Sequence, residues 1–262
     1  NNISRGGYAI SWLGDAGTPG RIENVQARNN QTNNQGVTGA SLSLASGAFT
    51  VRNTAVYDAD LFGLYLYEAE ADLENILVHG VTKSALSINR STVDVKQGTF
   101  AHNPEGGIWV TDDSQINITN SILWNPADYE LRVTPGGVLC SVNVSSSDVE
   151  GGMSDIIDPE NTITWNNGNI GTDPLFVDIA NLNYQLSHFS QCIGAGTVNE
   201  SPSEDLMRKN RPSPAGSNPD MGAYEHDAAS PRPKSGWITD GVEADLSWTN
   251  LNTIEAHWGD FL

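Results

Sequence analysis

The side chains of this chain that could take part in chemistry are carboxylates and aromatic rings. A glycoside hydrolase needs two or three carboxylates that converge on one face of the fold. A polysaccharide lyase needs an Arg or Lys base close to acidic ligands for Ca²⁺. The carboxylates considered for these roles are Asp58, Asp60, Glu68, Glu70, Asp72, Asp94, Asp112 and Asp113. Whether they converge depends on the elements that carry them.

Aromatic residues offer a different chemistry, because exposed rings stack on sugar rings or on partner surfaces. Tyr65 and Trp109 are 44 residues apart, and Tyr67 lies two positions after Tyr65. A second set comprises Tyr57, His79 and Trp124. We predict that both sets are candidate ligand-binding residues. The alternative is that loops or another domain cover them, or that the rings only stiffen the fold.

A short repeat identifies the elements that must position these side chains. It reads apolar, any residue, Asn-like, two of any residue, apolar, and its steps are 29, 22, 22, 23 and 26 residues, as in stacked repeats. The Asn-like position is occupied by Asn24, Asn53, Asn75, Gln97, Asn120 and Ser146. Polar side chains at tight corners adopt left-handed backbone geometry and hydrogen-bond stacked neighbours. We therefore expect a structural ladder rather than a ligand site.

A second apolar signal precedes the Asn pattern in each repeat and alternates with other residues, as in a half-buried strand. Its pairs are Leu42 and Leu44, Leu64 and Leu66, Leu86 and Ile88, Ile108 and Val110, and Leu131 and Val133. We expect three short strands per repeat, and no window has a convincing helical period. The pattern predicts an all-β fold, a right-handed parallel β-helix over residues 1–149.

This register also aligns charged residues in outward columns. One column contains Glu23, Arg52, Glu74 and Lys96, and another contains Glu68, Arg90 and Asp112. Unlike charges on neighbouring strands attract one another, so these basic residues, with Arg132 as a further candidate, are assigned to ladders. The carboxylates, in contrast, spread over several columns. We therefore predict no catalytic residues in this segment.

Composition excludes several classes of partner. The formal charge is −19, from 13 Lys and Arg against 32 Asp and Glu. This balance argues against nucleic acid and anionic membranes, which require a basic surface, and no run is long enough to insert into a membrane. The chain lacks an initial Met, so we expect a processed or partial protein. Cys140 and Cys192 could form a disulfide or remain two buried thiols.

Residues 150–226 leave the 22-residue register. Five separated motifs occur here: Asn169–Asp178, Tyr184–Leu186, Ser190–Thr197, Asp205–Pro212 and Pro219–Glu225. Over residues 144–225 they resemble the C-terminal cap of bacterial secreted β-helix proteins, the choice-of-anchor Q domain, except for Gln191 where Pro is usual. The resemblance implies a secreted or cell-surface bacterial protein whose β-helix this segment closes. An open solenoid end exposes strand edges and therefore needs such a cap.

The last residues have the composition of a linker followed by a new domain. Residues 227–236 form a Pro-rich, semi-rigid linker. Residues 237–262 resemble the opening strands of a fibronectin-like β-sandwich repeat of large bacterial surface proteins. We expect this sandwich to continue beyond Leu262, in a longer modular protein.

Together these observations favour a non-catalytic extracellular or cell-surface module that presents its repeat face for adhesion or carbohydrate binding. Its expected partners are a polysaccharide, a host or cell-surface partner, and other domains of the same protein. One alternative is a secreted polysaccharide lyase or glycoside hydrolase with catalytic repeats upstream; another is a structural spacer. No cofactor is expected, although Ca²⁺ is a candidate at the turns near Glu68–Asp72 and Asp112–Asp113.

Overall fold

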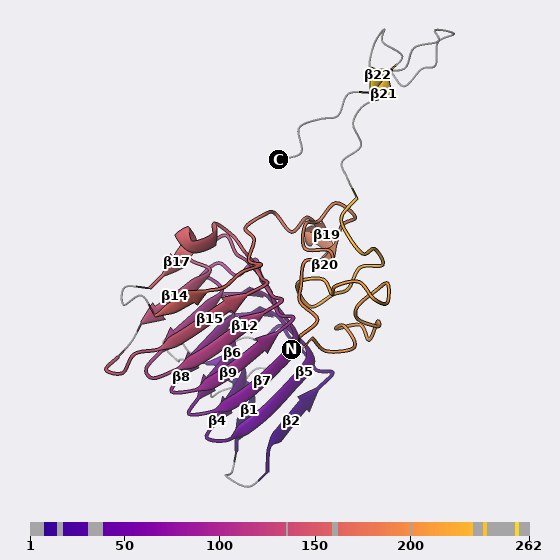
Figure 1. Ribbon diagram of the computed structural model, residues 1–262. Helices are drawn as coiled ribbons and strands as arrows, with labels where there is room; N and C mark the ends of the chain where they lie inside the picture. Colours follow the sequence, from indigo (N-terminus) through magenta and orange to yellow (C-terminus); the bar gives the residue numbers. More distant parts are fainter. Residues whose placement is uncertain are drawn as a thin grey trace.

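The protein folds into a β-solenoid in which parallel strands stack from one coil to the next (Figure 1). The computed structural model describes residues 8–14, 18–30, 39–134, 136–158, 162–199, 201–232, 238–239 and 255–256. Within these ranges the predicted parallel β-helix is confirmed, with two parallel sheets and almost no helix.

The strands of the two sheets follow the repeat. The seven-stranded sheet contains β1 (Tyr8–Leu13), β4 (Ala40–Ala45), β6 (Phe62–Tyr67), β8 (Leu86–Asn89), β11 (Ile108–Thr111), β14 (Leu131–Thr134) and β17 (Ile156–Ile157). The eleven-stranded sheet contains β2 (Gly20–Glu23), β3 (Gln26–Arg28), β5 (Ala48–Ala59), β7 (Glu70–Val81), β9 (Thr92–Lys96), β10 (Thr99–Ala101), β12 (Gln115–Thr119), β13 (Ile122–Trp124), β15 (Ser141–Ser145), β16 (Asp148–Val149) and β18 (Ile163–Trp165).

Apolar side chains of successive coils stack directly on one another inside the solenoid. One column contains Leu42, Leu64, Leu86, Ile108 and Leu131. A parallel column contains Leu44, Leu66, Ile88, Val110 and Val133. All ten side chains are buried, and burying each stabilises the fold by about 1.5–3 kcal/mol. These are the pairs that the sequence pattern predicts for the first strand of each repeat.

The Asn ladder (Asn24, Asn53, Asn75, Gln97, Asn120 and Ser146) forms the corner at which the eleven-stranded sheet turns. All six residues have positive φ, between 47° and 58°, so the predicted left-handed geometry is confirmed. The Asn75 amide donates to the Asn53 side-chain oxygen across 2.9 Å. The corner therefore needs residues that tolerate this backbone conformation.

Further polar columns supply the hydrogen bonds of the other corners. Glu68, Arg90 and Asp112 also have positive φ, so this charged column lies at a second left-handed corner. At this second corner the hydroxyls of Ser91 and Ser114 each accept a backbone N–H from the preceding coil. Ser121 and Ser147 do the same beside the Asn ladder. These side chains satisfy backbone donors that would otherwise be buried without a partner.

The residues that follow the last coils form a C-terminal segment, residues 171–232, with little regular structure. It contains β19 (Phe176–Asp178), the 3₁₀ turn η2 (Ile179–Asn181) and β20 (Asn183–Leu186), with β19 and β20 antiparallel. Before it, β16 leads into the 3₁₀ turn η1 (Gly152–Asp155), and β17 and β18 pair with the coils before them.

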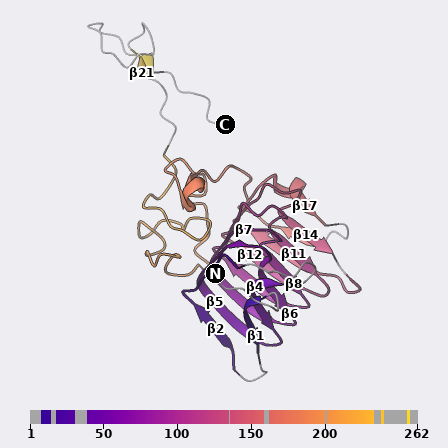
Figure 2. The ribbon, with the colours of Figure 1, turned by 180° about the vertical axis from the view of Figure 1, so that it is seen from behind.

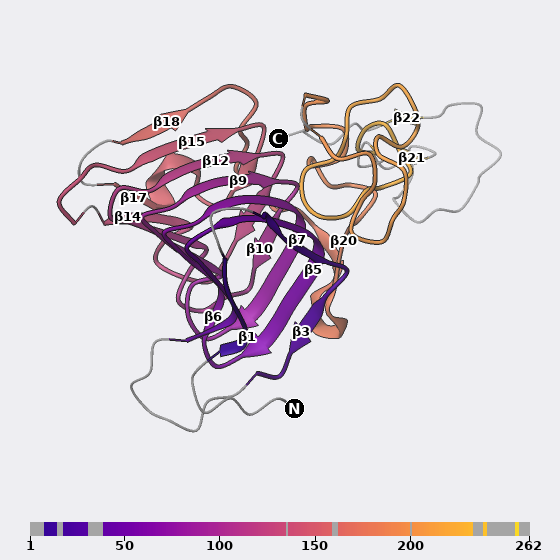
Figure 3. The ribbon, with the colours of Figure 1, turned by 90° about the horizontal axis from the view of Figure 1, so that it is seen from below.

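The C-terminal segment lies along the side of the solenoid (Figures 1 and 3). We expected this segment to close an end of the β-helix, and the structure instead places it over the outer face of β7, β10 and β13. The physical reason is that these strands carry outward apolar side chains. Leu77 packs against Tyr184 and Ala223, and Ile122 packs against Leu186.

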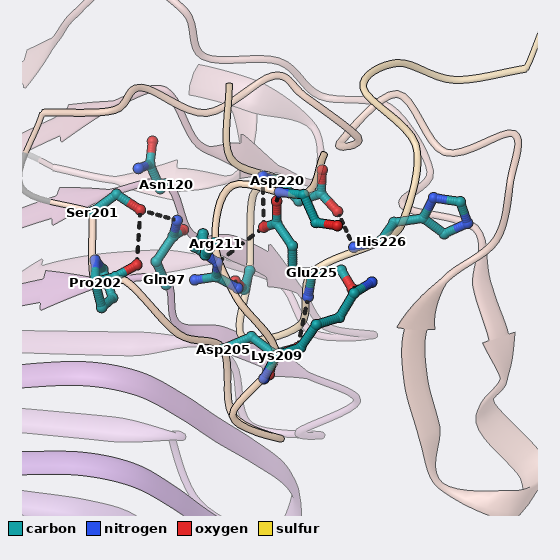
Figure 4. Close-up of polar contacts among 12 residues, drawn as sticks. Gln97, Asn120, Ser201, Pro202, Asp205, Lys209, Arg211, Asp220, Glu225 and His226 are labelled. Atoms are coloured by element: carbon teal, nitrogen blue, oxygen red, sulfur yellow. Dashed lines mark hydrogen bonds and ion pairs between the residues drawn. The ribbon is translucent and has the colours of Figure 1, made fainter. Parts of the chain in front are cut away.

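A buried ion pair within the C-terminal segment connects it to the Asn ladder. Arg211 Nε lies 2.9 Å from Glu225 Oε2, and both side chains are fully buried. The Arg211 guanidinium also donates to Asn75 Oδ1 at 3.1 Å and to the Gly222 carbonyl at 3.1 Å. Figure 4 shows Arg211 and Glu225 together, with Asp205 and Asp220 beside them.

Cys140 and Cys192 are two buried, unpaired thiols, which is the alternative to a disulfide between them. The Cys192 thiol donates to Asp148 Oδ2 across 3.0 Å, which ties the C-terminal segment to β16.

Of residues 237–262, the structure describes two short strands, β21 (Ile238–Thr239) and β22 (Glu255–Ala256), which pair antiparallel. The other residues expected to form a β-sandwich lie outside the described ranges. The fibronectin-like repeat therefore stays a prediction.

Candidate functional site

Tyr65 and Trp109 lie in one outward column of the seven-stranded sheet, as the register predicts. Ser87 is the register partner of both residues, and Arg132, one coil after Trp109, continues the column. Figure 2 shows the strands that carry this column, β6, β8, β11 and β14, side by side. Both rings are half-buried. Because Ser87 is small and lies between them, the two rings can lie along the sheet without a clash.

Phe62 joins the two rings into one cluster. Its ring centroid is 6.3 Å from that of Tyr65 and 6.2 Å from that of Trp109. The next residue must be glycine, since a Cβ at Gly63 would lie 2.4 Å from the Ala85 carbonyl oxygen. Phe62 is buried, so Tyr65 and Trp109 rather than Phe62 present the surface of this cluster.

Arg132 and Tyr129 extend this cluster along the column. The Arg132 guanidinium carbon lies 5.7 Å from the Trp109 ring centroid and 5.9 Å from that of Tyr129, within the range of a cation–π contact. We expected Arg132 to be a further member of a charge ladder, and the structure places it against aromatic rings instead. We call Phe62, Tyr65, Trp109, Tyr129 and Arg132 the aromatic face.

Hydrogen bonds hold the outer members of the aromatic face in place. The Trp109 indole N–H donates to Thr134 Oγ1 at 3.2 Å, and the Tyr129 hydroxyl lies 3.0 Å from Ser84 Oγ. Neither Phe62 nor Tyr129 was predicted as a site residue. The register could have identified Arg132, because it stands one repeat after Trp109, but Tyr129 lies in a loop outside the repeat pattern.

Tyr67 is hydrogen-bonded to the charged column of Glu68, Arg90 and Asp112. Its hydroxyl accepts a hydrogen bond from Arg90 Nη1 at 3.2 Å, and Arg90 also lies 3.5 Å from Glu68. Tyr67 therefore lies on the same sheet as Tyr65 but has a polar partner in the ladder.

The second predicted set, Tyr57, His79 and Trp124, does form a column. Tyr57 pairs with His79, and Ala101 pairs with both His79 and Trp124. The C-terminal segment covers this column, however: His79 is 3% exposed, and its ring centroid is 4.7 Å from that of Tyr184. The alternative that another part of the chain covers the rings therefore applies to His79. Tyr57 and His79 also line a groove of about 380 Å³, so ligand binding by this set stays a prediction.

Burial also removes His79 as an acid–base group at neutral pH. The loss of water around the ring lowers the pKa of His79 to about 4. The Tyr57 ring stacks on it, with centroids 5.0 Å apart and an interplanar angle of 10°. A neutral, stacked imidazole in this position contributes to packing.

The charge columns align as predicted and form ion pairs in part, since the ion pair of Glu23 is with Arg21 of its own strand. Arg52 Nε lies 2.7 Å from Glu74 Oε2, one coil away. Register places Glu23 next to Arg52 and Lys96 next to Glu74. Such exposed pairs contribute at most about 1 kcal/mol each. Their basic members thus lie beside carboxylates of neighbouring coils.

A shallow polar groove lies over β9, β12 and β15, and Asp94 is the carboxylate among the residues that line it. Asp72 and Asp94 are adjacent in register, and Asn117 donates to Asp94 at 2.7 Å. Asn143 continues this column by donating to Asn117. The groove along Asp94, Asn117 and Asn143 has a volume of about 280 Å³. Amides rather than further acids continue the row, so no set of three carboxylates converges there.

In the described ranges, no three His, Cys, Asp or Glu side chains lie close enough together to hold one metal ion. The turns near residues 68–72 and 112–113 thus stay predictions as Ca²⁺ sites. Within the same ranges no helix has the length and apolar character needed to cross a membrane.

Comparison with known proteins identifies a family to which the chain is similar. The sequence profile of a family described as "Right handed beta helix region" matches residues 1–129 and 38–168. No curated protein and no solved structure matches the chain significantly.

Proposed function

Because the chain belongs to the right-handed β-helix family, we propose that it is a non-catalytic, carbohydrate-binding module of an extracellular or cell-surface protein. The aromatic face is its binding surface. The observation that carries this proposal is the pair of half-buried rings, Tyr65 and Trp109, in one outward column two coils apart.

The geometry of this pair suits a glycan chain. Neighbouring parallel strands lie about 4.8 Å apart, so the two rings are separated by roughly 10 Å along the solenoid. This separation is comparable with the length of a disaccharide. Each ring offers a flat apolar surface on which the C–H face of a sugar can stack, and the Arg132 guanidinium beside Trp109 can donate to sugar hydroxyls.

Charge narrows the class of glycan. The net charge of −19 repels polyanions, and Arg132 already lies over Trp109. A neutral polysaccharide, or a neutral glycan on a host or cell surface, therefore fits better than an acidic one. Adhesion through such a glycan agrees with the secreted or surface location implied by the resemblance of residues 144–225 to bacterial anchor-associated caps.

A glycan array probed with the intact chain tests the proposal, followed by calorimetric titration of the best neutral oligosaccharide. We expect the Trp109→Ala variant to bind at least about tenfold more weakly, a loss of about 1.4 kcal/mol. Phe189→Ala removes another exposed ring, 43% exposed, from the C-terminal segment and is the matched control.

Two outcomes would overturn the assignment of the aromatic face. One is the absence of any glycan signal from the intact chain, as a structural spacer would give. The other is unchanged affinity in Trp109→Ala with a native circular dichroism spectrum. Release of shortened oligosaccharides during the titration would instead reveal catalysis.

A further inference from the structure

The Asn ladder binds the chain's own C-terminal segment over three coils. The Asn120 amide donates to the Thr197 carbonyl at 2.8 Å, and its oxygen accepts the Thr197 N–H at 2.8 Å. The Gln97 amide donates to Ser201 Oγ at 3.1 Å, as Figure 4 shows. The ladder therefore already receives a polypeptide that runs across successive coils.

Asn75 shows how one ladder amide divides its two N–H groups. Its Nδ2 donates to Asn53 Oδ1 at 2.9 Å, the ladder neighbour, and to the Glu204 carbonyl at 2.7 Å, in the C-terminal segment. Asn75 is buried as a result. One N–H serves the ladder, and the other serves a main-chain carbonyl.

Two further members of the ladder lie beyond the point at which the segment leaves it. Asn53 is half-exposed and Asn24 is exposed, and the Asn53 amide reaches Asn24 Oδ1 only across 3.5 Å. In the part of the chain that the structure describes, neither amide donates to a main-chain carbonyl as Asn75 does. Side-chain amides that hold the segment on three coils thus have equivalents, on Asn53 and Asn24, that face outward.

A groove of about 380 Å³ lies over these two residues. The solenoid lines it with the polar residues Asn24, Gln26 and Asn53 and with apolar and aromatic residues that include Tyr57. The C-terminal segment contributes Leu182, Met207 and Tyr224.

Leu182 and Met207 present apolar side chains to solvent, 46% and 67% exposed. The left-handed backbone of Leu182 belongs to the C-cap of η2, where its N–H donates to the Ile179 carbonyl. Exposed apolar side chains that lie together are candidates for contact with a ligand. Both side chains line the groove, where a ligand would cover them.

We propose that this groove binds an extended peptide of a partner protein. Main-chain carbonyls of the peptide accept hydrogen bonds from Asn53 and Asn24, and apolar side chains of the peptide pack on Leu182 and Met207. A peptide suits the groove because it would continue an existing contact. The ladder binds Thr197, Ser201 and Glu204 through main-chain and hydroxyl groups on the adjacent coils, and the groove begins at Leu206 and Met207, where that segment turns away.

A fluorescent, uncharged heptapeptide in which Val alternates with Thr, titrated into the full chain, tests this site by anisotropy and by NMR line broadening. The double variant Asn24→Gly and Asn53→Gly removes both amides, while glycine keeps the left-handed backbone. We expect the dissociation constant to rise at least tenfold in the double variant and several-fold in Met207→Ala. Met153→Ala is the matched control, because Met153 is 51% exposed and lies in η1, outside the groove.

The outcomes separate this site from the aromatic face. Peptide affinity that is unchanged in Trp109→Ala and in Met153→Ala supports the proposal. Absence of peptide binding at millimolar concentration overturns it, as does equal affinity of the double glycine variant. Displacement of the peptide by maltohexaose, a neutral oligosaccharide, would assign the groove to carbohydrate and also overturn it. If the double variant does not fold, the peptide affinities of Met207→Ala and Met153→Ala are compared instead. Weaker binding in Met207→Ala alone supports the proposal, and equal affinities overturn it.

Discussion

Glu130 is a carboxyl group that the solenoid encloses almost completely. It is 1% exposed, and its two oxygens accept the backbone and side-chain N–H groups of Asn125 at 2.6 and 2.7 Å. Loss of water around the carboxyl group outweighs these bonds and raises the pKa of Glu130 to about 8. The side chain is therefore mostly protonated at neutral pH, which suits an enclosed corner better than a charge would.

This burial makes stability depend on pH. The pKa of Glu130 is higher in the folded chain than its ordinary value of 4.5, so the stabilisation is complete below about pH 4.5 and is lost as the pH rises through about 8. We expect the free energy of unfolding to fall by about 1 kcal/mol between pH 7 and pH 9 from this group. Urea denaturation at each pH measures it.

The matched variant for this prediction is Glu130→Gln, which cannot ionise. Its stability should change less between pH 7 and pH 9 than that of the unaltered chain. Burial also raises the pKa of Asp148 to about 6 and that of Asp220 to about 7, so their contributions fall mainly below this window. An equal slope for both proteins would contradict the assignment to Glu130.

Each residue of the Asn ladder has two tasks: it must adopt a left-handed backbone, and its side chain must form hydrogen bonds. Asn75 meets both, since it has φ of 53° and bonds to Asn53, Glu204 and Arg211. Asn24 has φ of 57° but is exposed. The two residues therefore share the left-handed backbone and differ in the hydrogen bonds that their side chains form.

Replacing each of them with leucine separates the two demands. Asn24→Leu should cost about 1–2 kcal/mol of stability, from the left-handed backbone alone. Asn75→Leu should cost roughly 2 kcal/mol more, because the buried Arg211 guanidinium and the Glu204 carbonyl lose their hydrogen bonds to Asn75. Thermal or urea denaturation compares the variants. Equal losses at the two positions would show that only the backbone matters.

The strand register was predictable because it depends on local pattern. Core pairs such as Leu64 and Leu66 recur with a nearly constant step, and parallel stacking converts that step directly into neighbours in space. The register also placed Tyr65 and Trp109 in one column, so part of the aromatic face was predictable. The second left-handed corner at Glu68, Arg90 and Asp112 was missed as a corner, since charged residues have no strong preference for that geometry.

The position of the C-terminal segment could not be predicted, because it depends on contacts between residues more than a hundred positions apart. Arg211 bonds to Asn75, and Ala223 packs near Leu77. The outward Leu77 and Ile122 were the available signal that this face of the solenoid is covered. Without their partners, they cannot be told from scattered surface apolar residues.

At the scale of the whole molecule, the buried pair of Arg211 and Glu225 links the C-terminal segment to the solenoid. Arg211→Met leaves the Glu225 carboxylate buried without its partner, which costs about 3–5 kcal/mol. We expect this variant to release the segment, so limited proteolysis should cut between residues 171 and 232 much faster. Hydrogen exchange of the segment measures the same release.

A surface ion pair provides the control for this prediction. Lys83 lies 2.8 Å from Glu105, with both side chains about half exposed, and Lys83→Met should cost less than about 1 kcal/mol. Proteolysis of the segment should be unchanged in that variant. Equal protection in Arg211→Met and Lys83→Met would show that apolar packing alone holds the segment in place.

The stacking of equivalent residues has a consequence for how such a protein can change. The distance between the Tyr65 and Trp109 rings is a whole number of strand separations, because one coil, with Ser87 at the matching position, lies between them. Gain or loss of a single 22-residue coil would therefore lengthen or shorten this distance by about 4.8 Å. The ring spacing therefore changes only in whole steps of one coil. Duplication of one repeat could change which ligand length fits without altering any contact within a coil.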